Sequence, residues 1–202
     1  MTKHFHSSCP RLYYRIEADH CADATKAFLD ARTAAMDAKR EIWKEKYGAE
    51  GGTTGGSIAS RGLLYADTAA SREAMYALAS KGGFKQPKRI KDGDSAWWQL
   101  SPNRSTALGK VVQADLEQVE KLLDDWQWAL ERALGINGAY YYDRAFHNNL
   151  AHALSDGSVA ISIVTAPKDR EPTAIPTHAQ PISEIEYREM RATATHYEES
   201  LP

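Results

Sequence analysis

The apolar residues between Val111 and Leu134 recur in alternating steps of four and three along most of that segment. They are Val112, Leu116, Val119, Leu123, Trp126, Leu130 and Ala133. This spacing places every one of these side chains on one face of an α-helix. We expect a helix that begins near Thr106 or Lys110 and ends before Gly135, which supplies a C-terminal stop. A chain with such a helix must bury the apolar face against another element.

A second long helix is predicted nearer the N-terminus. Asp19 or Asp23 can cap its start, and Gly48 can end it after about Tyr47. The helix has an apolar stripe that keeps one face on a core. That stripe consists of Leu29, Met36, Trp43 and Tyr47, broadened by Phe28, Ala35 and Ile42.

The sequence also predicts several β-strands before, between and after these helices, and together they indicate the fold class. Leu12, Tyr14 and Ile16 alternate with polar residues in a predicted strand over 11–17, and Val159–Val164 has the composition of an inner strand. Shorter strands are expected over 61–66 and 96–100, with helices over about 68–80 and over 145–154, the latter bounded by Asp156 and Gly157. We therefore expect an α+β fold, a small mixed or antiparallel sheet packed by two long amphipathic helices and shorter helices.

The chain divides into three predicted parts. Residues 1–10 are a polar arm, 11–166 are a single α+β domain, and 167–202 are a proline-punctuated tail. Four prolines are expected to break regular structure in that tail before a short helix begins at Ser183, where Ser183 and Glu186 have the capping-box spacing. The prolines are Pro167, Pro172, Pro176 and Pro181.

Charge and composition exclude several classes of function. The formal net charge is -2, from 25 basic and 27 acidic side chains, which excludes both a strongly basic nucleic-acid coat and an acidic DNA mimic. The two cysteines, Cys9 and Cys21, do not form a disulfide framework. No apolar run approaches the length of a membrane span, and the first residues lack the apolar core of a signal peptide. We expect a cytoplasmic protein with no membrane association.

A basic segment followed by aromatic residues is the strongest candidate for a binding site. Positive charge combined with aromatic rings is typical of single-strand nucleic-acid binders, and it also suits an acidic protein partner. A solvated basic loop with one tryptophan in the core is the alternative. The candidate binding residues are Lys85, Lys88, Arg89, Lys91, Trp97, Trp98 and Arg104. An acidic set on the long helix, including Asp115 and Glu120, is predicted to be its solvated face, with a docking surface for a basic protein as the alternative.

The candidates for catalysis are weaker. Asp143 and His147 are four residues apart, so a helix would place them on one face, beside Tyr142 and Arg144. No nucleophile motif accompanies them, and an ion pair on a helix surface is the alternative interpretation. The glycine-rich segment 51–57 lacks the lysine and the strand-to-helix position of a phosphate-binding loop, which favours a flexible connector. The sequence does not decide whether the chain is an enzyme, and we favour a binding protein.

Metal binding is not predicted. His4, His6, Cys9, His20 and Cys21 provide nitrogen and sulfur, but their spacing is not that of a tetrahedral zinc site. The neighbours His20 and Cys21 are expected to point in different directions. We expect no metal and no cofactor.

The predicted compact α+β body is followed by a tail that contains several prolines and a capped helix over residues 181–190. This arrangement resembles small accessory proteins of tailed phages, prophages or other mobile elements. This resemblance implies a non-enzymatic protein-binding module that inhibits or modulates a host complex, such as a defence complex. The alternatives are a small enzyme or binder acting on a nucleotide or phosphorylated ligand, and a single-stranded nucleic-acid binder that uses the 81–91 loop. Apolar residues beyond the main stripe, Leu122 and Trp128, leave both a monomer and a homodimer open.

Overall fold

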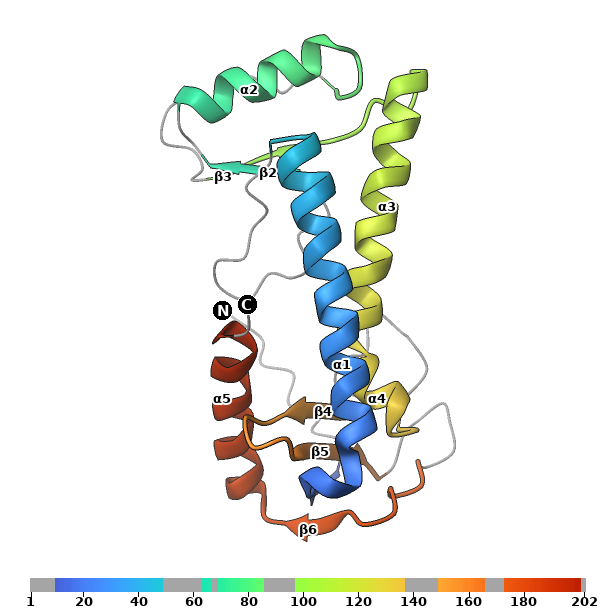
Figure 1. The fold of residues 1–202 in the computed structure, drawn as a ribbon, viewed down its shortest axis with the longest axis vertical. Helices are drawn as coiled ribbons and strands as arrows, with labels where there is room; N and C mark the ends of the chain where they lie inside the picture. Colours follow the sequence, from blue (N-terminus) through green and yellow to red (C-terminus); the bar gives the residue numbers. More distant parts are fainter. Residues whose placement is uncertain are drawn as a thin grey trace, which may run out of the picture. The chain divides into compact units, whose positions relative to one another are not determined.

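The computed structural model describes residues 10–48, 63–66, 69–85, 97–136, 149–165 and 173–200. It has the predicted α+β fold, with helices and two antiparallel sheets (Figure 1). The chain divides into two compact units, each of which is described by itself. Unit 1 comprises Met1–Asp30 and Gln127–Pro202, and unit 2 comprises Ala31–Trp126.

Unit 1 contains a four-stranded antiparallel sheet in the order β4-β5-β1-β6. Its centre is β5, Val159–Val164, in which all six residues are buried. β1, Arg11–Ile16, pairs with β5 from Arg11 opposite Val164 to Ile16 opposite Val159. Both strands confirm the sequence prediction. Apolar and polar residues alternate in β1 because one of its faces is more buried than the other. β5 is a continuous run of small and apolar residues because both of its faces are covered.

The predicted helix over 145–154 is wrong for its last residues. Leu150–Ala153 form strand β4, which pairs with β5 in a hairpin. Asp156 and Gly157 lie in the hairpin turn, where Gly157 has φ +83° and the Leu154 N–H donates to the Ser158 carbonyl at 2.9 Å. Asp-Gly favours a tight hairpin turn, so the dipeptide that we interpreted as a helix boundary reverses the chain between two strands.

The proline-rich tail also contains a strand that the sequence did not predict. β6, Gln180–Ile182, pairs with β1 and places Pro181 opposite Tyr14. Proline is tolerated in an edge strand, where its missing N–H is not needed for the ladder. Because Pro181 has no N–H to offer, it also limits pairing of a further strand with β6.

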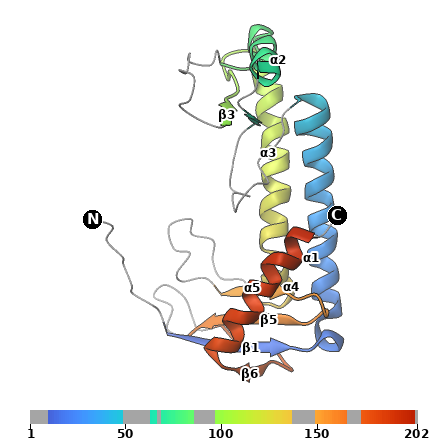
Figure 2. The same ribbon diagram turned by 90° about the vertical axis from the view of Figure 1, so that its left-hand side faces the viewer.

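α5, Glu184–Ser200, packs on the sheet and confirms the predicted capping box. The Ser183 N–H donates to Glu186 Oε2 at 2.7 Å, and the Glu186 N–H donates to Ser183 Oγ at 3.2 Å. Tyr187 and Ala194, two turns apart, are buried with Leu154 and Ala160. Figure 2 shows α5 running across one face of the sheet, in agreement with its contacts to β1, β4 and β5.

Two buried polar side chains fix the far end of the sheet in unit 1. Asn149 is fully buried, and its Nδ2 donates to the Ile136 carbonyl at 2.8 Å and to Thr173 Oγ1 at 2.7 Å. Its Oδ1 accepts the Val164 N–H at 2.9 Å. Glu131, in the short helix α4 (Ala129–Ala133), accepts the Ala151 N–H at 2.8 Å. These side chains satisfy backbone groups where the strands end.

In unit 2 the first long helix changes its winding. α1, Ala18–Ala38, continues as a π-helix, η1, Lys39–Lys46, and ends at Gly48, where φ is +66° as the predicted C-terminal stop requires. Within unit 2 the buried positions include Ala35, Ile42 and Trp43, whereas Met36 is only half-buried. The buried stripe is therefore centred about one residue earlier than Leu29 and Met36. The apolar residues one position earlier also recur every seven residues, so the spacing alone did not show which set is buried.

α3, Ala107–Gln127, buries the predicted residues Val112, Leu116, Val119, Leu123 and Trp126. The helix does not continue to Leu134, because Trp128 leaves helical geometry with φ -116° and ψ 14°, and α4 follows. Ala133 is exposed, which corrects its assignment to the stripe. Gly135 has φ +68° and ends the segment as predicted.

The second sheet of unit 2 has two strands. β2, Leu63–Ala66, pairs antiparallel with β3, Trp97–Leu100, so the two short strands expected from the sequence are neighbours. Helix α2, Ala69–Ser80, follows β2 and ends at Gly82, which has φ +82°. The residues that directly follow α2 lie beside the residues that directly precede α3, and these two segments form the candidate site.

Candidate binding site

Two segments distant in the sequence lie side by side at the start of α3. Phe84 forms a β-bridge with Pro102, and the Lys85 N–H donates to the Ser101 carbonyl at 2.9 Å. The Asn103 N–H donates to the Gly83 carbonyl at 3.0 Å. These backbone hydrogen bonds bring Lys85 close to the segment that carries Arg104.

Thr106 joins the same two segments to α3. Its Oγ1 accepts the Gly109 N–H at 3.0 Å as a helix N-cap and lies 2.7 Å from the Gly82 carbonyl, to which the hydroxyl can donate. Gly109 packs so tightly that an added Cβ would lie 1.8 Å from the Asn103 carbonyl oxygen. The start of α3 is therefore fixed against the loop that precedes it.

A pocket of about 400 Å³ lies within this frame. Leu100 and Leu116 belong to its lining but are almost fully buried, at 1% and 4% exposure. Polar side chains and backbone complete the lining. The lining residues are Lys85, Leu100, Ser101, Pro102, Arg104, Gln113, Leu116 and Glu120.

The two cations of the pocket retain hydrogen-bond donors. Arg104 Nε donates to Gln113 Oε1 at 3.2 Å, and Gln113 Nε2 donates to Glu117 Oε1 at 2.7 Å, so the guanidinium is held in place through an uncharged amide. Within the described ranges, neither Lys85 nor Arg104 forms an ion pair with a carboxylate. The Arg104 Nη atoms and the Lys85 ammonium can therefore bind an external anion.

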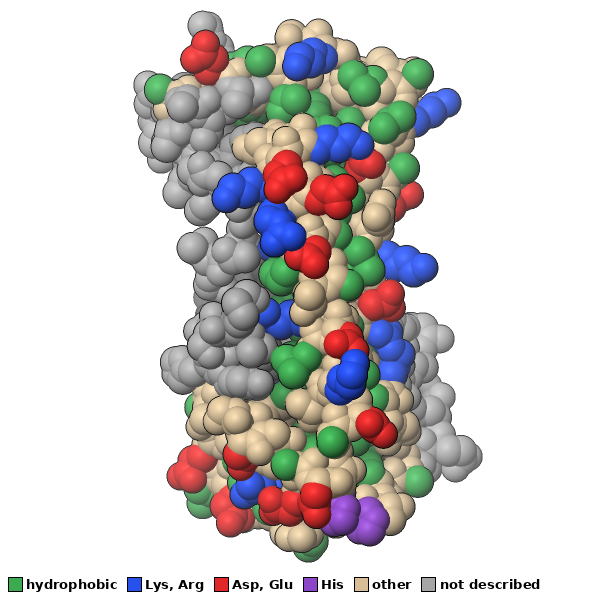
Figure 3. Space-filling model, viewed as in Figure 1, with side chains coloured by type: hydrophobic (Ala, Val, Ile, Leu, Met, Phe, Trp, Pro, Cys, Tyr) green, Lys and Arg blue, Asp and Glu red, His purple; other side chains and the backbone are tan. Residues whose placement is uncertain are grey.

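The predicted binding residues are thus only partly brought together. Lys85 and Arg104 line one pocket, whereas Lys88, Arg89 and Lys91 lie outside the described residues. Trp97 and Trp98 begin β3, opposite Ala66 and Tyr65. On the face in Figure 3, Lys and Arg side chains alternate with Asp and Glu along the helices of unit 2, with hydrophobic side chains between them.

The weak catalytic candidates Tyr142, Asp143, Arg144 and His147 lie outside the described residues, as do the glycine-rich segment 51–57 and His4, His6 and Cys9. Two members of the nitrogen and sulfur set are described. His20 stacks on His178, with ring centroids 4.0 Å apart, whereas Cys21 is buried at 3% exposure. Among the residues that the structure describes, no group of three or more His, Cys, Asp or Glu side chains is placed to hold a metal ion.

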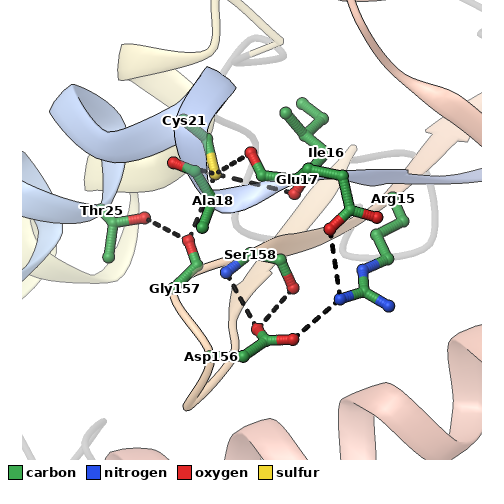
Figure 4. A network of polar contacts seen from close by, with 9 residues as sticks. All are labelled: Arg15, Ile16, Glu17, Ala18, Cys21, Thr25, Asp156, Gly157 and Ser158. Atoms are coloured by element: carbon green, nitrogen blue, oxygen red, sulfur yellow. Dashed lines mark hydrogen bonds and ion pairs between the residues drawn. The ribbon is translucent and has the colours of Figure 1, made fainter.

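Cys21 belongs to a network of local contacts (Figure 4). Its Sγ lies 3.3 Å from the carbonyl oxygens of Glu17 and Gly157, and Thr25 Oγ1 donates to the same Gly157 oxygen at 3.3 Å. Burial raises the pKa of the Cys21 thiol, so it stays protonated and donates these weak hydrogen bonds. Cys21 joins α1 to the hairpin turn and is not an activated nucleophile.

Sequence reasoning missed most of the pocket's other wall. Gln113 and Glu120 lie on the polar side of α3, beside Leu116. Their seven-residue spacing marks one helix face, but nothing in the sequence indicates that residues 101–104 pack against that face. The structure places His152 on β4, with its Nε2 3.1 Å from Tyr187 Oη.

Comparison with known proteins does not assign the chain to a family. None of the helices in the described ranges combines the length and apolar composition that crossing a membrane requires. No protein-family model matches the chain, and neither the curated proteins nor the solved structures contain a significant match.

Proposed function

We propose that the chain is a non-enzymatic binding module that recognises an acidic segment of a partner protein through the pocket of Lys85 and Arg104. The observation that carries this proposal is that Lys85 and Arg104 line one pocket and that neither forms an ion pair with a described carboxylate. A carboxylate of the partner can bind the guanidinium edge beside the lysine ammonium.

The composition of the pocket favours a carboxylate over a polyphosphate or nucleic acid. Glu120 adds a negative charge to the lining, so Lys85 and Arg104 leave only one formal positive charge in excess. Nucleic-acid binding needs several cations along a phosphate backbone, and the chain as a whole carries a net charge of -2. A single acidic side chain matches the pocket better.

The resemblance to accessory proteins of phages and other mobile elements completes this proposal. A small binding protein of that kind acts as an inhibitor or modulator of a host complex, such as a defence complex. Recognition of an acidic segment on the host protein would then be the step in which Lys85 and Arg104 take part.

Fluorescence polarisation tests the binding site with labelled peptides of about ten residues that alternate leucine with glutamate or aspartate. The matched control peptides carry glutamine or asparagine at the acidic positions. We expect the acidic peptides alone to bind, and the double variant Lys85→Gln, Arg104→Gln to weaken them by about tenfold, since two exposed charged contacts contribute roughly 1 to 2 kcal/mol together. Lys81→Gln is the control variant, because Lys81 is exposed and does not line the pocket.

Equal affinity of the acidic and amide peptides, or of the double variant and the parent chain, would refute the proposal. The phosphorylated-ligand alternative is tested in parallel with ATP and inorganic phosphate in a thermal unfolding assay, because a ligand that binds only the native state raises Tm. A rise in Tm that the double variant abolishes would replace the acidic peptide with a phosphate ligand at the same pocket.

A further inference from the structure

Two histidine contacts attach the C-terminal segment 176–194 to the rest of unit 1. The first lies beneath α5, where Nε2 of His152 on β4 is 3.1 Å from the hydroxyl oxygen of Tyr187. Tyr187 is 4% exposed, so its hydroxyl needs a partner inside the protein. A neutral imidazole nitrogen can accept this O–H, whereas a protonated imidazole can only donate to the Tyr187 oxygen and leaves the hydroxyl proton to Ser162.

The charged groups around His152 oppose its protonation. Arg191 on α5 is close enough to repel a positive imidazole, while Arg11 on β1 is directed to Ser162 Oγ at 2.9 Å. On α4 the nearest carboxylate, Glu131, accepts the Ala151 N–H. Burial, followed by Arg191, lowers the pKa of His152 to about 4, so the ring is neutral at pH 7.

The second contact holds the turn before β6. The ring of His178 stacks on that of His20 in α1, with centroids 4.0 Å apart and planes inclined by 10°. His178 has φ +68°, a left-handed conformation that a residue with a side chain seldom adopts, in a turn closed by the Ala179 N–H and the Pro176 carbonyl. Asp19 Oδ2 lies 3.7 Å from His20 Nε2.

The rest of the segment is only lightly attached. β6 has three residues and pairs with β1 alone among the described strands. In the described part of α5, Tyr187 and Ala194 are the buried side chains and Met190 is half-buried, while the other side chains are exposed. Elements with few buried apolar contacts open at a lower free energy than the core of the same unit. Loss of the contact beneath α5 therefore weakens the attachment of this helix to the sheet.

We propose that protonation of His152 releases α5 from the sheet, so that unit 1 contains an acid-triggered conformational switch. Release exposes the face of the sheet that α5 covers, including Tyr13, His152 and Ser162. β5 stays folded in this open state, because all of its residues are buried between neighbouring strands on both sides.

Hydrogen exchange of the full chain, measured by mass spectrometry between pH 7.5 and pH 4.5 as protection factors, tests the switch. A proton taken up only in the open state lowers protection about tenfold for each pH unit below the ordinary histidine range. We expect α5 amides to lose about a hundredfold between pH 6.5 and pH 4.5, and β5 amides to keep their protection. His152→Gln, which can still accept the Tyr187 O–H through its amide oxygen, should reduce the loss in α5 to less than about threefold. Loss of protection in α5 and β5 together, or an unchanged pH dependence in this variant, would overturn the proposal.

Two further variants keep the test decisive if His152→Gln does not fold. Tyr187→Phe removes only the hydroxyl, and we expect α5 protection at pH 7.5 to fall by about tenfold while β5 is unchanged, since one hydrogen bond is worth about 1 kcal/mol. Unchanged protection of α5 would show that this contact does not hold the helix. His178→Asn keeps a residue that tolerates positive φ but removes the ring stacked on His20, and it is a control in which the pH dependence of α5 exchange should match that of the parent chain.

Discussion

The polar groups around the hairpin turn of unit 1 and those in the pocket of unit 2 are arranged differently. At the turn, Asp156 Oδ2 accepts from Arg15 at 2.8 Å, while its Oδ1 accepts from the Ser158 N–H and hydroxyl at 3.0 and 2.6 Å (Figure 4). In the pocket, Lys85 and the Nη atoms of Arg104 are not paired with any described carboxylate. A polar cluster whose groups bind one another stabilises the fold, whereas one with spare donors is available to a ligand.

Asn149 is the strongest test of this distinction within unit 1. Asn149→Ala removes three buried hydrogen bonds and leaves the Ile136 carbonyl and the Val164 N–H without their partner. Each buried polar group left unsatisfied costs about 1 to 3 kcal/mol, so we expect the free energy of unfolding to fall by roughly 3 to 4 kcal/mol. Urea unfolding at neutral pH measures this change.

A loss below about 1 kcal/mol for Asn149→Ala would show that other groups can replace the amide. Asn149→Asp is the matched variant. It keeps an acceptor for the Val164 N–H but directs a carboxylate oxygen at the Ile136 carbonyl, and it should also destabilise the chain. Only the amide has both a donor and an acceptor for this position.

Gly109 tests how rigidly the pocket is built. In Gly109→Ala the new Cβ would meet the Asn103 carbonyl at 1.8 Å, so the loop or the first turn of α3 must move. We expect a loss of about 2 to 3 kcal/mol, typical of overpacking, and a loss of acidic-peptide binding because Arg104 follows Asn103 directly. Gly82→Ala is the control. Its Cβ would meet nothing within 4 Å, so only the left-handed φ of +82° costs energy, about 1 kcal/mol.

The larger elements of the fold could be predicted because their patterns are local. Alternation in β1, the step pattern of α3 and the spacing of Ser183 and Glu186 each depend on residues within one element. The hairpin at Asp156 and Gly157 was misinterpreted because the same dipeptide can end a helix or join two strands. The choice between them depends on whether Leu150–Ala153 find β5 as a partner, and this is a tertiary interaction.

The candidate site shows the same limit. Charge alone was enough to select Lys85 and Arg104, but the sequence did not indicate that the two would share a pocket. The bridge between Phe84 and Pro102 brings them together, and the intervening chain includes β3. Likewise, the change from α1 to a π-helix at Lys39 was not predicted, because π-helical geometry is rare and the expectation for such a segment is an α-helix.

Asp156 is predicted to contribute less than Asn149, because its side chain is 55% exposed. Hydrogen bonds from the Ser158 hydroxyl and N–H, and then the Arg15 charge, hold the pKa of Asp156 below its ordinary value. The folded state therefore favours the ionised form, and this contribution is present above about pH 4 and is lost as the pH falls through the lowered pKa. Asp156→Ala should cost about 1 kcal/mol at pH 7 and almost nothing at pH 2.

Urea titrations of Asp156→Ala and the parent chain at both pH values measure this difference. A cost that is the same at pH 7 and pH 2 would mean that the ionised carboxylate is not what stabilises the turn. The pH range of the loss also distinguishes the contribution of Asp156 to stability from that of His152. The lowered pKa of His152, about 4, makes its contribution fall between about pH 6.5 and pH 4, before Asp156 begins to titrate.

The smallest predicted effect on the free energy of unfolding is at the pocket. Its charged side chains are expected to stabilise the fold much less than those at the hairpin turn do. Lys85→Gln and Arg104→Gln each remove a charge that is not paired with a described carboxylate, so each should change the free energy of unfolding by less than about 0.5 kcal/mol. Arg104→Gln also loses one exposed hydrogen bond to Gln113, which contributes little in contact with water. Thermal unfolding of the two variants beside Lys81→Gln checks this. A loss above about 1 kcal/mol would mean that these cations stabilise the fold itself, as Arg15 and Asp156 do at the turn, and it would remove the physical reason for assigning them to a partner.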